Sequence, residues 1–272
     1  MTQAARVTLT NQELNTLVDI LETAWTTCSP IEPPSESHGL EFSQSYEVQR
    51  RWTKHRLANG ETLLGHKIGL TSEAIQTQLG VDQPDFGSLW SSRYFEARNG
   101  KAQTAADLFL YPRAEAEIAF KLGRDIDAAN GEVSWQDVLA ATEAVAPALE
   151  IVDSRVKDWR ITIVDTIADN ASYGGFTIGD WSAIAKHDDL GAIKMTLHHN
   201  DKIAAEGVGA AALGHPAKAV AWLANTLGKL GTPLKAGDII LSGALSKAVD
   251  MASGDVITAE FSELESITLE VT

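Results

Sequence analysis

The chain has 272 residues, 44% of them apolar, which is enough for one large domain, or one domain with an appendage, built around a sizeable core. Its formal net charge of −15 argues against a nucleic-acid partner, because a phosphate backbone attracts basic surfaces, and it favours the attraction of cations such as metal ions. A single cysteine, Cys28, excludes an intramolecular disulfide, and neither an export signal nor a membrane-length apolar stretch is present, so we expect a cytoplasmic protein with no membrane partner.

The N-terminal part is predicted to be helical. Thr10 to Glu13 form a capping box that opens an amphipathic helix through roughly Thr27. A proline-rich loop follows, and a second helix is expected from Ser43 to about Ala58, ending at Asn59-Gly60. We predict a helical N-terminal subdomain over residues 1–61, followed by short strands from residue 62.

The first of these strands, Leu63 to Leu70, carries an unusual lysine. Lys67 lies in the middle of an apolar run with a glycine two residues to either side. An ammonium in that setting suits the close approach of a small anionic ligand, although a lysine taken alone more commonly extends to the surface.

A short helix from Ser72 to about Leu79 is expected next, and then a turn-rich loop, Gly80 to Gly87. Asp82 and Asp85 lie in this loop. Aspartate in a proline- and glycine-rich segment is usually a turn former, which is the simplest interpretation of both residues.

The stretch from Arg113 to Gly123 alternates as a β-strand with one apolar face. Glu115 and Glu117 project side by side from the other face, because side chains two residues apart on a strand point the same way. A divalent metal bound between the two carboxylates would offset their repulsion. The alternative is the solvated face of an edge strand, where charges prevent aggregation.

A helix is predicted from Ser134 to Ala144, followed by a buried strand that contains Glu150. A carboxylate inside such a run must be paired or metal-bound, because an isolated buried charge is very costly. A salt bridge to Arg155 or Arg160 is one possibility, and completion of a three-carboxylate site for Mg²⁺ or Mn²⁺ is the other. No histidine pair has the spacing of a zinc site.

The remaining chain alternates strands with few helices. The stretch Asp165 to Gly175 ends a helix-like segment in small polar residues, where backbone amides and a hydroxyl suit a carboxylate ligand, with helix capping as the alternative. A helix is predicted from Pro216 to Lys229, and Lys235 to Ile240 and Ala252 to Ile257 are each predicted to be a turn that leads into a strand. The order of elements predicts an α+β fold without a Rossmann or P-loop fingerprint.

Together these segments resemble the 2-hydroxypenta-2,4-dienoate (2-keto-4-pentenoate) hydratases of aromatic meta-cleavage pathways, within the fumarylacetoacetate hydrolase superfamily. The resemblance rests on Gly65–Ser72, Leu79–Gly87, Glu115–Phe120, Leu149–Arg155, Ala168–Ser172, Gly209–Pro216 and Val220–Leu227. It covers nearly the whole chain. It implies a mixed β-sandwich or roll core with a helical N-terminal part, the catalytic β-roll occupying residues 62–272.

The resemblance also implies site residues. Glu115, Glu117 and Glu150 match the metal-binding carboxylates. Lys67 would neutralise developing charge or relay a proton, and Asp85 would act as the base for water or the acid for the diene terminus. The substrate-binding residues would be Ser172, Asn170 and Asp82.

The implied activity is that of a hydro-lyase that adds water to 2-hydroxypenta-2,4-dienoate and forms 4-hydroxy-2-oxopentanoate. The chain also resembles 4-oxalocrotonate decarboxylase, which shares the metal and the lysine. The hydratases carry an aspartate where Asp85 stands and the decarboxylases lack it, so the hydratase is preferred. An acylpyruvate-type C–C hydrolase is a further alternative, and a non-catalytic acidic protein, in which the carboxylates form structural salt bridges, is the non-enzymatic one. A homo-oligomer is expected, with a sister decarboxylase as a possible partner.

Overall fold

The computed structural model describes residues 8–72, 76–77, 80–187 and 189–272. The helix expected from Ser72 to about Leu79 includes residues outside these ranges and stays a prediction. Among the described residues, none of the helices has the length and apolar character that a membrane crossing requires.

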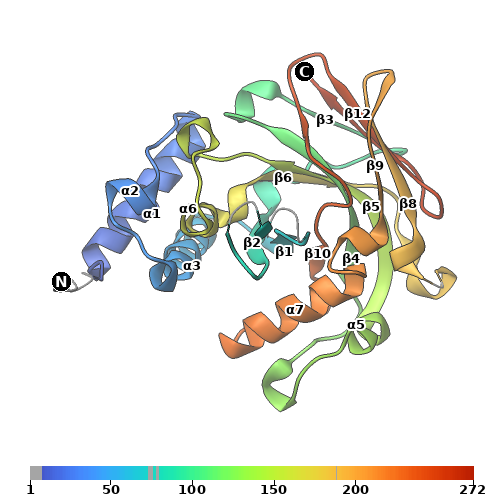
Figure 1. The fold of residues 1–272 in the computed structure, drawn as a ribbon, viewed down its shortest axis with the longest axis horizontal. Coiled ribbons are helices and arrows are strands. Elements are labelled where there is room, and N and C mark those ends of the chain that lie inside the picture. The colour runs from blue at the N-terminus through green and yellow to red at the C-terminus, as the bar shows by residue number, and fades with distance from the viewer. Residues whose placement is uncertain (1–7, 73–75, 78–79, 188) are drawn as a thin grey trace.

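Two mixed β-sheets form the body of the molecule (Figure 1). The strands of the larger sheet are β1 (Leu63–Gly69), β2 (Asp85–Trp90), β4 (Arg113–Leu122), β5 (Thr142–Val152), β6 (Tyr173–Ile178), β7 (Ser182–Ala183), β10 (Ile239–Leu241) and β11 (Val249–Asp250). Those of the smaller sheet are β3 (Lys101–Thr104), β8 (Lys194–His199), β9 (Lys202–Val208), β12 (Val256–Phe261) and β13 (Ile267–Val271).

The strand order is β2-β1-β10-β4-β5-β6 in the larger sheet, with β11 beside β4 and β7 beside β5. In the smaller sheet it is β3-β13-β12-β8-β9. The pairs β1–β10 and β3–β13 are parallel, and the other pairs are antiparallel. The predicted α+β class with mixed sheets is therefore confirmed.

The helices are α1 (Asn11–Thr27), α2 (Pro34–Ser37), α3 (Phe42–Ala58), α5 (Trp135–Ala141), α6 (Ile163–Ala168) and α7 (Pro216–Lys229). Helix α1 begins where predicted, because the Thr10 side chain accepts from the Glu13 N–H while the Glu13 carboxylate accepts from the Thr10 N–H. Helix α5 ends three residues before the predicted Ala144, because the chain pairs with β4 from Thr142 onward. Helix α7 has its predicted bounds.

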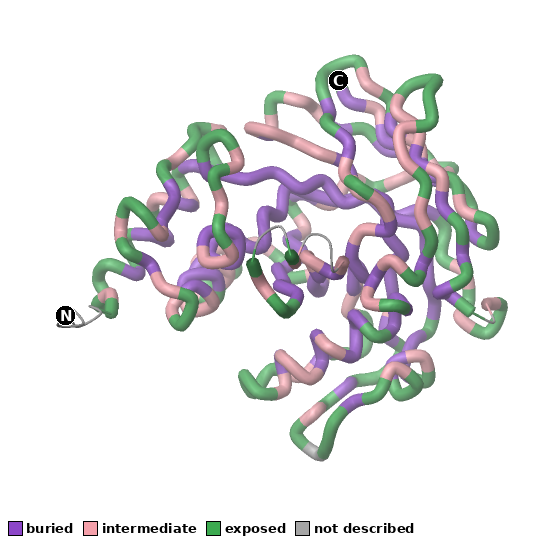
Figure 2. The backbone as a smooth tube through the Cα atoms, viewed as in Figure 1, coloured by how far each residue is buried: buried purple, intermediate pink, exposed green. Residues whose placement is uncertain are grey.

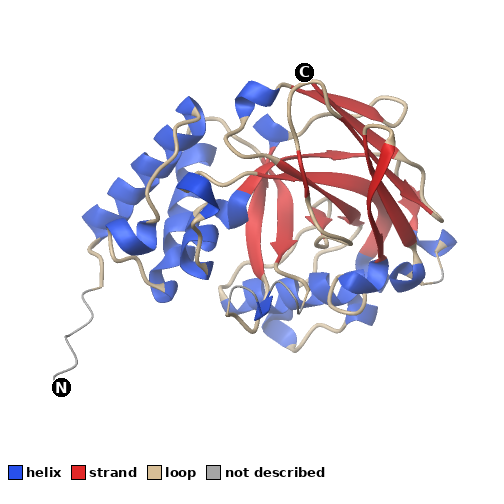
Figure 3. Ribbon diagram, turned by 45° about the horizontal axis from the view of Figure 1, so that its top comes forward, coloured by secondary structure: helices blue, strands red, loops and turns tan. Residues whose placement is uncertain are grey.

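Two cores lie on opposite faces of the larger sheet. The smaller sheet, α5 and α7 contribute to one core, and α1, α3 and α6 to the other. Side-chain alternation along β4 explains how one strand serves both cores: Ile118 and Phe120 face the first, and Ala119 faces the second. The helices of the second core stand together beside the sheet in Figures 1 and 3, and β5 is buried along nearly its whole length (Figure 2). The predicted division between residues 61 and 62 stays a prediction.

Candidate active site

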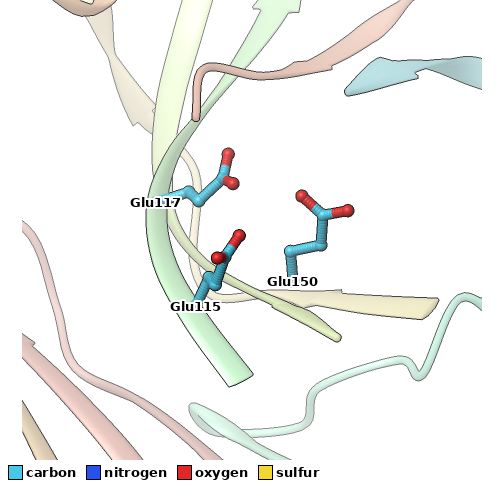
Figure 4. A group of neighbouring side chains, drawn as sticks. All are labelled: Glu115, Glu117 and Glu150. Atoms are coloured by element: carbon cyan, nitrogen blue, oxygen red, sulfur yellow. The ribbon is translucent and has the colours of Figure 1, made fainter. Parts of the chain in front are cut away.

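Three glutamates converge on the face of the larger sheet that looks toward the N-terminal helices. Glu115 of β4 lies directly opposite Glu150 of β5, and Glu117 follows two residues later on the same face. Their side chains point toward one another (Figure 4), and one carboxylate oxygen of each lies within 4.8 Å of the others. Because β4 lies between β10 and β5, the edge-strand interpretation of Glu115 and Glu117 is wrong.

The carboxylates of this cluster are poorly satisfied. Glu117 and Glu150 are fully buried, and Glu115 is partly buried. The Gly243 N–H donates to Glu117 Oε2 at 2.7 Å, but Glu117 Oε1 and both Glu150 oxygens have no hydrogen-bond partner among the described residues. Buried carboxylate oxygens without partners, converging from two strands, form an oxygen-only donor set that fits a hard divalent cation.

The raised pKa values of the three glutamates also favour a bound cation. Burial, and then the negative charge of Glu150, raises the pKa of Glu115 to about 7. The pKa values of Glu117 and Glu150 are also raised by burial, and the charge of Glu150 raises that of Glu117 further. Like charges directly opposite each other on paired strands are destabilising, so a cation in the cluster would relieve a real repulsion.

Lys67 reaches the same cluster from β1 and is only 2% exposed. Its Nζ donates to the Ala171 carbonyl at 2.8 Å and lies 3.1 Å from Glu150 Oε1, an ion pair outside hydrogen-bond geometry. Burial alone would lower the pKa of Lys67, but the charges of Glu150 and Asp85 outweigh it and hold the pKa above its ordinary value. The side chain is therefore a buried cation, and the expectation that a lone lysine extends to the surface is wrong.

The salt-bridge partners considered for Glu150 are also corrected. Arg155 pairs with Asp169, with its Nε 2.5 Å from Oδ1, and Arg160 pairs with Glu32 and Glu36. Glu150 faces Lys67 instead, although β10 and β4 lie between β1 and β5 in the sheet.

Asp85 begins β2 directly opposite Gly69 of β1 and is 1% exposed, so its interpretation as a turn residue is wrong. A Cβ at Gly69 would lie 2.2 Å from Asp85 Oδ1, so only glycine leaves room for this carboxyl. Burial raises the pKa of Asp85, and the positive charge of Lys67 partly opposes that rise. Asp82 is exposed in the segment before β2, and within the described ranges no hydrogen bond or ion pair joins it to the cluster.

The segment after α6 forms a left-handed turn over Asn170–Ser172. The Ser172 hydroxyl lies 3.2 Å from the hydroxyl of Thr166, which in turn donates to Asp85 Oδ2 at 3.4 Å. The Asn170 side chain accepts from the Ser88 N–H at 2.7 Å and donates to the Ser88 carbonyl at 2.9 Å. Its amide is thus engaged with β2, which makes Asn170 an anchor of the turn.

Sequence reasoning did not identify Thr166, Gly69 or Gly87 as site residues. A Cβ at Gly87 would lie 2.4 Å from the Asn170 carbonyl oxygen and 3.1 Å from Lys67 Cδ, so this glycine allows the turn to approach the strands. The glycines that flank Lys67 and Asp85 in the sequence were the available indication of such close approach. No pattern in the sequence indicated that the Thr166 hydroxyl belongs to the site.

Comparisons with known proteins show what the chain is similar to. Residues 71–272 match the family model described as fumarylacetoacetate (FAA) hydrolase C-terminal. The chain is 40% identical over 264 residues to 2-keto-4-pentenoate hydratase of Paraburkholderia xenovorans, covering 96% of both chains. It is 47% identical over 226 residues to 2-hydroxyhexa-2,4-dienoate hydratase of Comamonas testosteroni, covering 83% of this chain and 84% of that one.

A solved structure is similar over the same length. The 4-oxalocrotonate decarboxylase of Pseudomonas putida G7, complexed with magnesium and adipate, matches with a TM-score of 0.92 at 30% identity. The match covers 97% of this chain and 99% of the decarboxylase.

Proposed function

The chain belongs to the fumarylacetoacetate hydrolase family, and we propose that it is a metal-dependent hydro-lyase that converts 2-hydroxypenta-2,4-dienoate and water to 4-hydroxy-2-oxopentanoate in the degradation of aromatic compounds. Relatives at 40% and 47% identity, similar over most of their length, are hydratases of short 2-hydroxydienoates or 2-keto-enoates. The single observation that carries the assignment is the buried Asp85 beside Lys67, at the edge of the glutamate cluster.

We assign the metal to Glu115, Glu117 and Glu150, which would hold Mg²⁺ or Mn²⁺. A bound divalent cation supplies Lewis acidity that polarises a 2-oxo group. Lys67 stays protonated and stabilises negative charge that develops on the substrate.

We assign proton transfer to Asp85 and substrate binding to Ser172. Asp85, whose pKa is raised by burial, holds a proton more readily than an exposed aspartate and can exchange it with the diene terminus or with water. The Ser172 hydroxyl donates to the substrate carboxylate. Asp82 stays a proposed substrate contact that awaits a variant.

Charge favours the hydratase over the decarboxylase. A dicarboxylate needs a second cation for its distal carboxylate. In the described part of the site, Lys67 is the buried cation beside the cluster, while Arg113 is paired with Asp250 and Arg155 with Asp169. The sequence from residue 70 to residue 87 carries no lysine or arginine, so this segment offers no cation to a distal carboxylate.

An ultraviolet assay with enzymatically generated 2-hydroxypenta-2,4-dienoate tests the proposal. We expect metal-dependent loss of the dienol absorbance that EDTA abolishes, 4-hydroxy-2-oxopentanoate as the product, and a large loss of rate in Asp85→Asn. Asp180→Asn, which changes an exposed aspartate, is the matched control. Carbon dioxide release from 2-oxo-3-hexenedioate without hydration would identify a decarboxylase, and cleavage of an acylpyruvate alone would identify a C–C hydrolase.

We also propose how the protein is organised, from the order of its helices and strands and from the family resemblance. We place the helical N-terminal subdomain at residues 1–61 and the catalytic β-roll at residues 62–272. The protein is proposed to be cytoplasmic and homo-oligomeric, with a sister decarboxylase as a candidate partner. Light scattering of the purified protein, alone and mixed with that decarboxylase, tests both assemblies.

A further inference from the structure

We propose that Arg155 is a positioning residue that holds the left-handed turn Asn170–Ser172 and, through it, the ammonium of Lys67. The effect on turnover rests on the proposed function, whereas the effect on the turn does not.

The turn consists of three successive residues other than glycine in the left-handed region. Their φ angles are 54° for Asn170, 53° for Ala171 and 52° for Ser172. This conformation is unfavourable for residues other than glycine, because Cβ approaches the following carbonyl oxygen. Such a run persists only when its surroundings determine it, and strained segments of this kind cluster at functional sites.

Arg155 bonds to the chain on both sides of the turn. Its Nη2 donates to the Asp169 carbonyl at 2.7 Å and its Nη1 donates to the Tyr173 carbonyl at 2.6 Å. These are the carbonyls immediately before and after the three left-handed residues. Nε donates to Asp169 Oδ1 at 2.5 Å, and the Arg155 backbone N–H donates to Oδ2 at 3.0 Å. A planar guanidinium can make these bonds together, whereas an ammonium at the same place cannot span both carbonyls.

The turn that Arg155 fixes presents two groups to the site. The Ala171 carbonyl accepts from Lys67 Nζ at 2.8 Å, and the Ser172 hydroxyl lies 3.2 Å from the Thr166 hydroxyl, next to Asp85. In a right-handed or extended turn, the Ala171 carbonyl would point elsewhere. Lys67 would then keep only its ion pair with Glu150.

The N-terminal helices hold the guanidinium itself. Its central carbon lies 5.2 Å from the ring centroid of Trp25 on α1 and 5.9 Å from that of Trp52 on α3. Cation–π attraction at a desolvated site is favourable, and Arg155 is 1% exposed. The chain of contacts therefore runs from the helices through Arg155 and the turn to Lys67.

The test compares Arg155→Lys with the double variant Arg155→Lys/Ala171→Gly. Glycine adopts the left-handed region without the Cβ penalty, so the second substitution removes strain that Arg155 otherwise holds. The matched control is Arg155→Lys/Asp158→Gly, because Asp158 also has a positive φ of 56° but is exposed and outside the turn. Crystal structures, Tm, kcat and KM are measured for each, with Ala171→Gly alone as the reference.

In Arg155→Lys we expect the turn to leave the left-handed region, the bond from Lys67 to Ala171 to be lost, and kcat to fall by about 10- to 100-fold with less change in KM. Ala171→Gly should restore the turn and recover kcat by about fivefold or more. Asp158→Gly should raise Tm without recovering kcat. Should Arg155→Lys not fold, Asp169→Asn takes its place, because it keeps the side-chain shape and removes the charge that Arg155 binds.

An unchanged turn in Arg155→Lys would overturn the inference, and so would equal recovery of kcat by Asp158→Gly, which would indicate a general stability effect. Failure of the proposed function is a separate outcome. It would show as a parent protein without hydratase turnover, and the crystal structures would still decide whether Arg155 holds the turn.

Discussion

Gly69 is the position at which a single added methyl group would disturb the proposed site most directly. It faces Asp85 across the β1–β2 pair, and a Cβ there would lie 2.2 Å from Asp85 Oδ1 and 3.4 Å from Lys67 Nζ. Favourable contacts between non-bonded heavy atoms lie at about 3.5 Å. In Gly69→Ala the Asp85 carboxyl must therefore move by roughly 1 Å.

A displacement of that size in a reacting group costs on the order of 100-fold in rate, or about 2.7 kcal/mol of activation free energy. We expect kcat for the dienol to fall by that factor in Gly69→Ala. Mn²⁺ binding, measured by titration calorimetry, should be unchanged, because the glutamates lie on β4 and β5.

The matched control is Gly123→Ala, just beyond the end of β4, where the new Cβ would meet Glu143 Cβ at 3.2 Å. We expect it to keep the activity of the parent. A folded Gly69→Ala protein with parental kcat would refute the role of Asp85. A parallel loss of Mn²⁺ affinity would show that the sheet, and not the Asp85 carboxyl alone, had moved.

Three further predictions concern the charges of the site. Burial and the charge of Glu150 raise the pKa of Glu115 to about 7 from an ordinary 4.5. Between these two pH values the folded metal-free protein therefore keeps a proton on Glu115 that the unfolded chain has released. The contribution of Glu115 to stability, measured by urea unfolding in EDTA, should therefore be full below about pH 4.5 and be lost as the pH rises through about 7. The Tm gain from Mn²⁺, about 5 °C, should be larger above that range than below it, and equal gains at both ends would contradict the linkage. Glu117→Gln should abolish the gain from Mn²⁺ but raise Tm in EDTA, because glutamine is neutral, whereas burial and the charge of Glu150 make it costly to keep Glu117 ionised in the folded protein. A lower Tm in EDTA would argue against this cost. Lys67→Met should lower kcat by roughly 100-fold. Unlike Glu117→Gln, it should also lower Tm in EDTA, because it removes the buried cation beside the carboxylates. Differential scanning fluorimetry in EDTA separates the two variants by the sign of the change in Tm.

Parts of the glutamate cluster could be predicted because their information is local, whereas the union of Glu150 with the other two depends on the pairing of β4 with β5. Alternation along one strand puts Glu115 and Glu117 on the same face, and an apolar run around Glu150 implies burial. The capping box of α1 and the proline start of α7 are equally local, and both helices formed where predicted. In each case the residues that decide the structure lie within a few positions of one another.

Partners that come from distant segments could not be predicted in the same way. Glu150 pairs with Lys67 and not with the nearby Arg155, although β10 and β4 lie between β1 and β5 in the larger sheet. Asp85 lies between Pro84 and Gly87, residues that favour a turn, yet pairing with β1 puts it in a strand. Tertiary pairing prevailed over local propensity at both residues.

The left-handed turn had no counterpart in the sequence pattern, because Asn170, Ala171 and Ser172 include no glycine to indicate a positive φ. Arg155 holds the turn, and Trp25 of α1 and Trp52 of α3 cover that arginine.

The predicted division between residues 61 and 62 separates helices from strands, but the site depends on both sides of it. The helices also share one core with β2, β5 and β6, so a chain cut at this boundary would expose that core and release the guanidinium that sets the turn. The N-terminal helices are for this reason part of the active site's support, although none of the proposed metal-binding or catalytic residues lies within them.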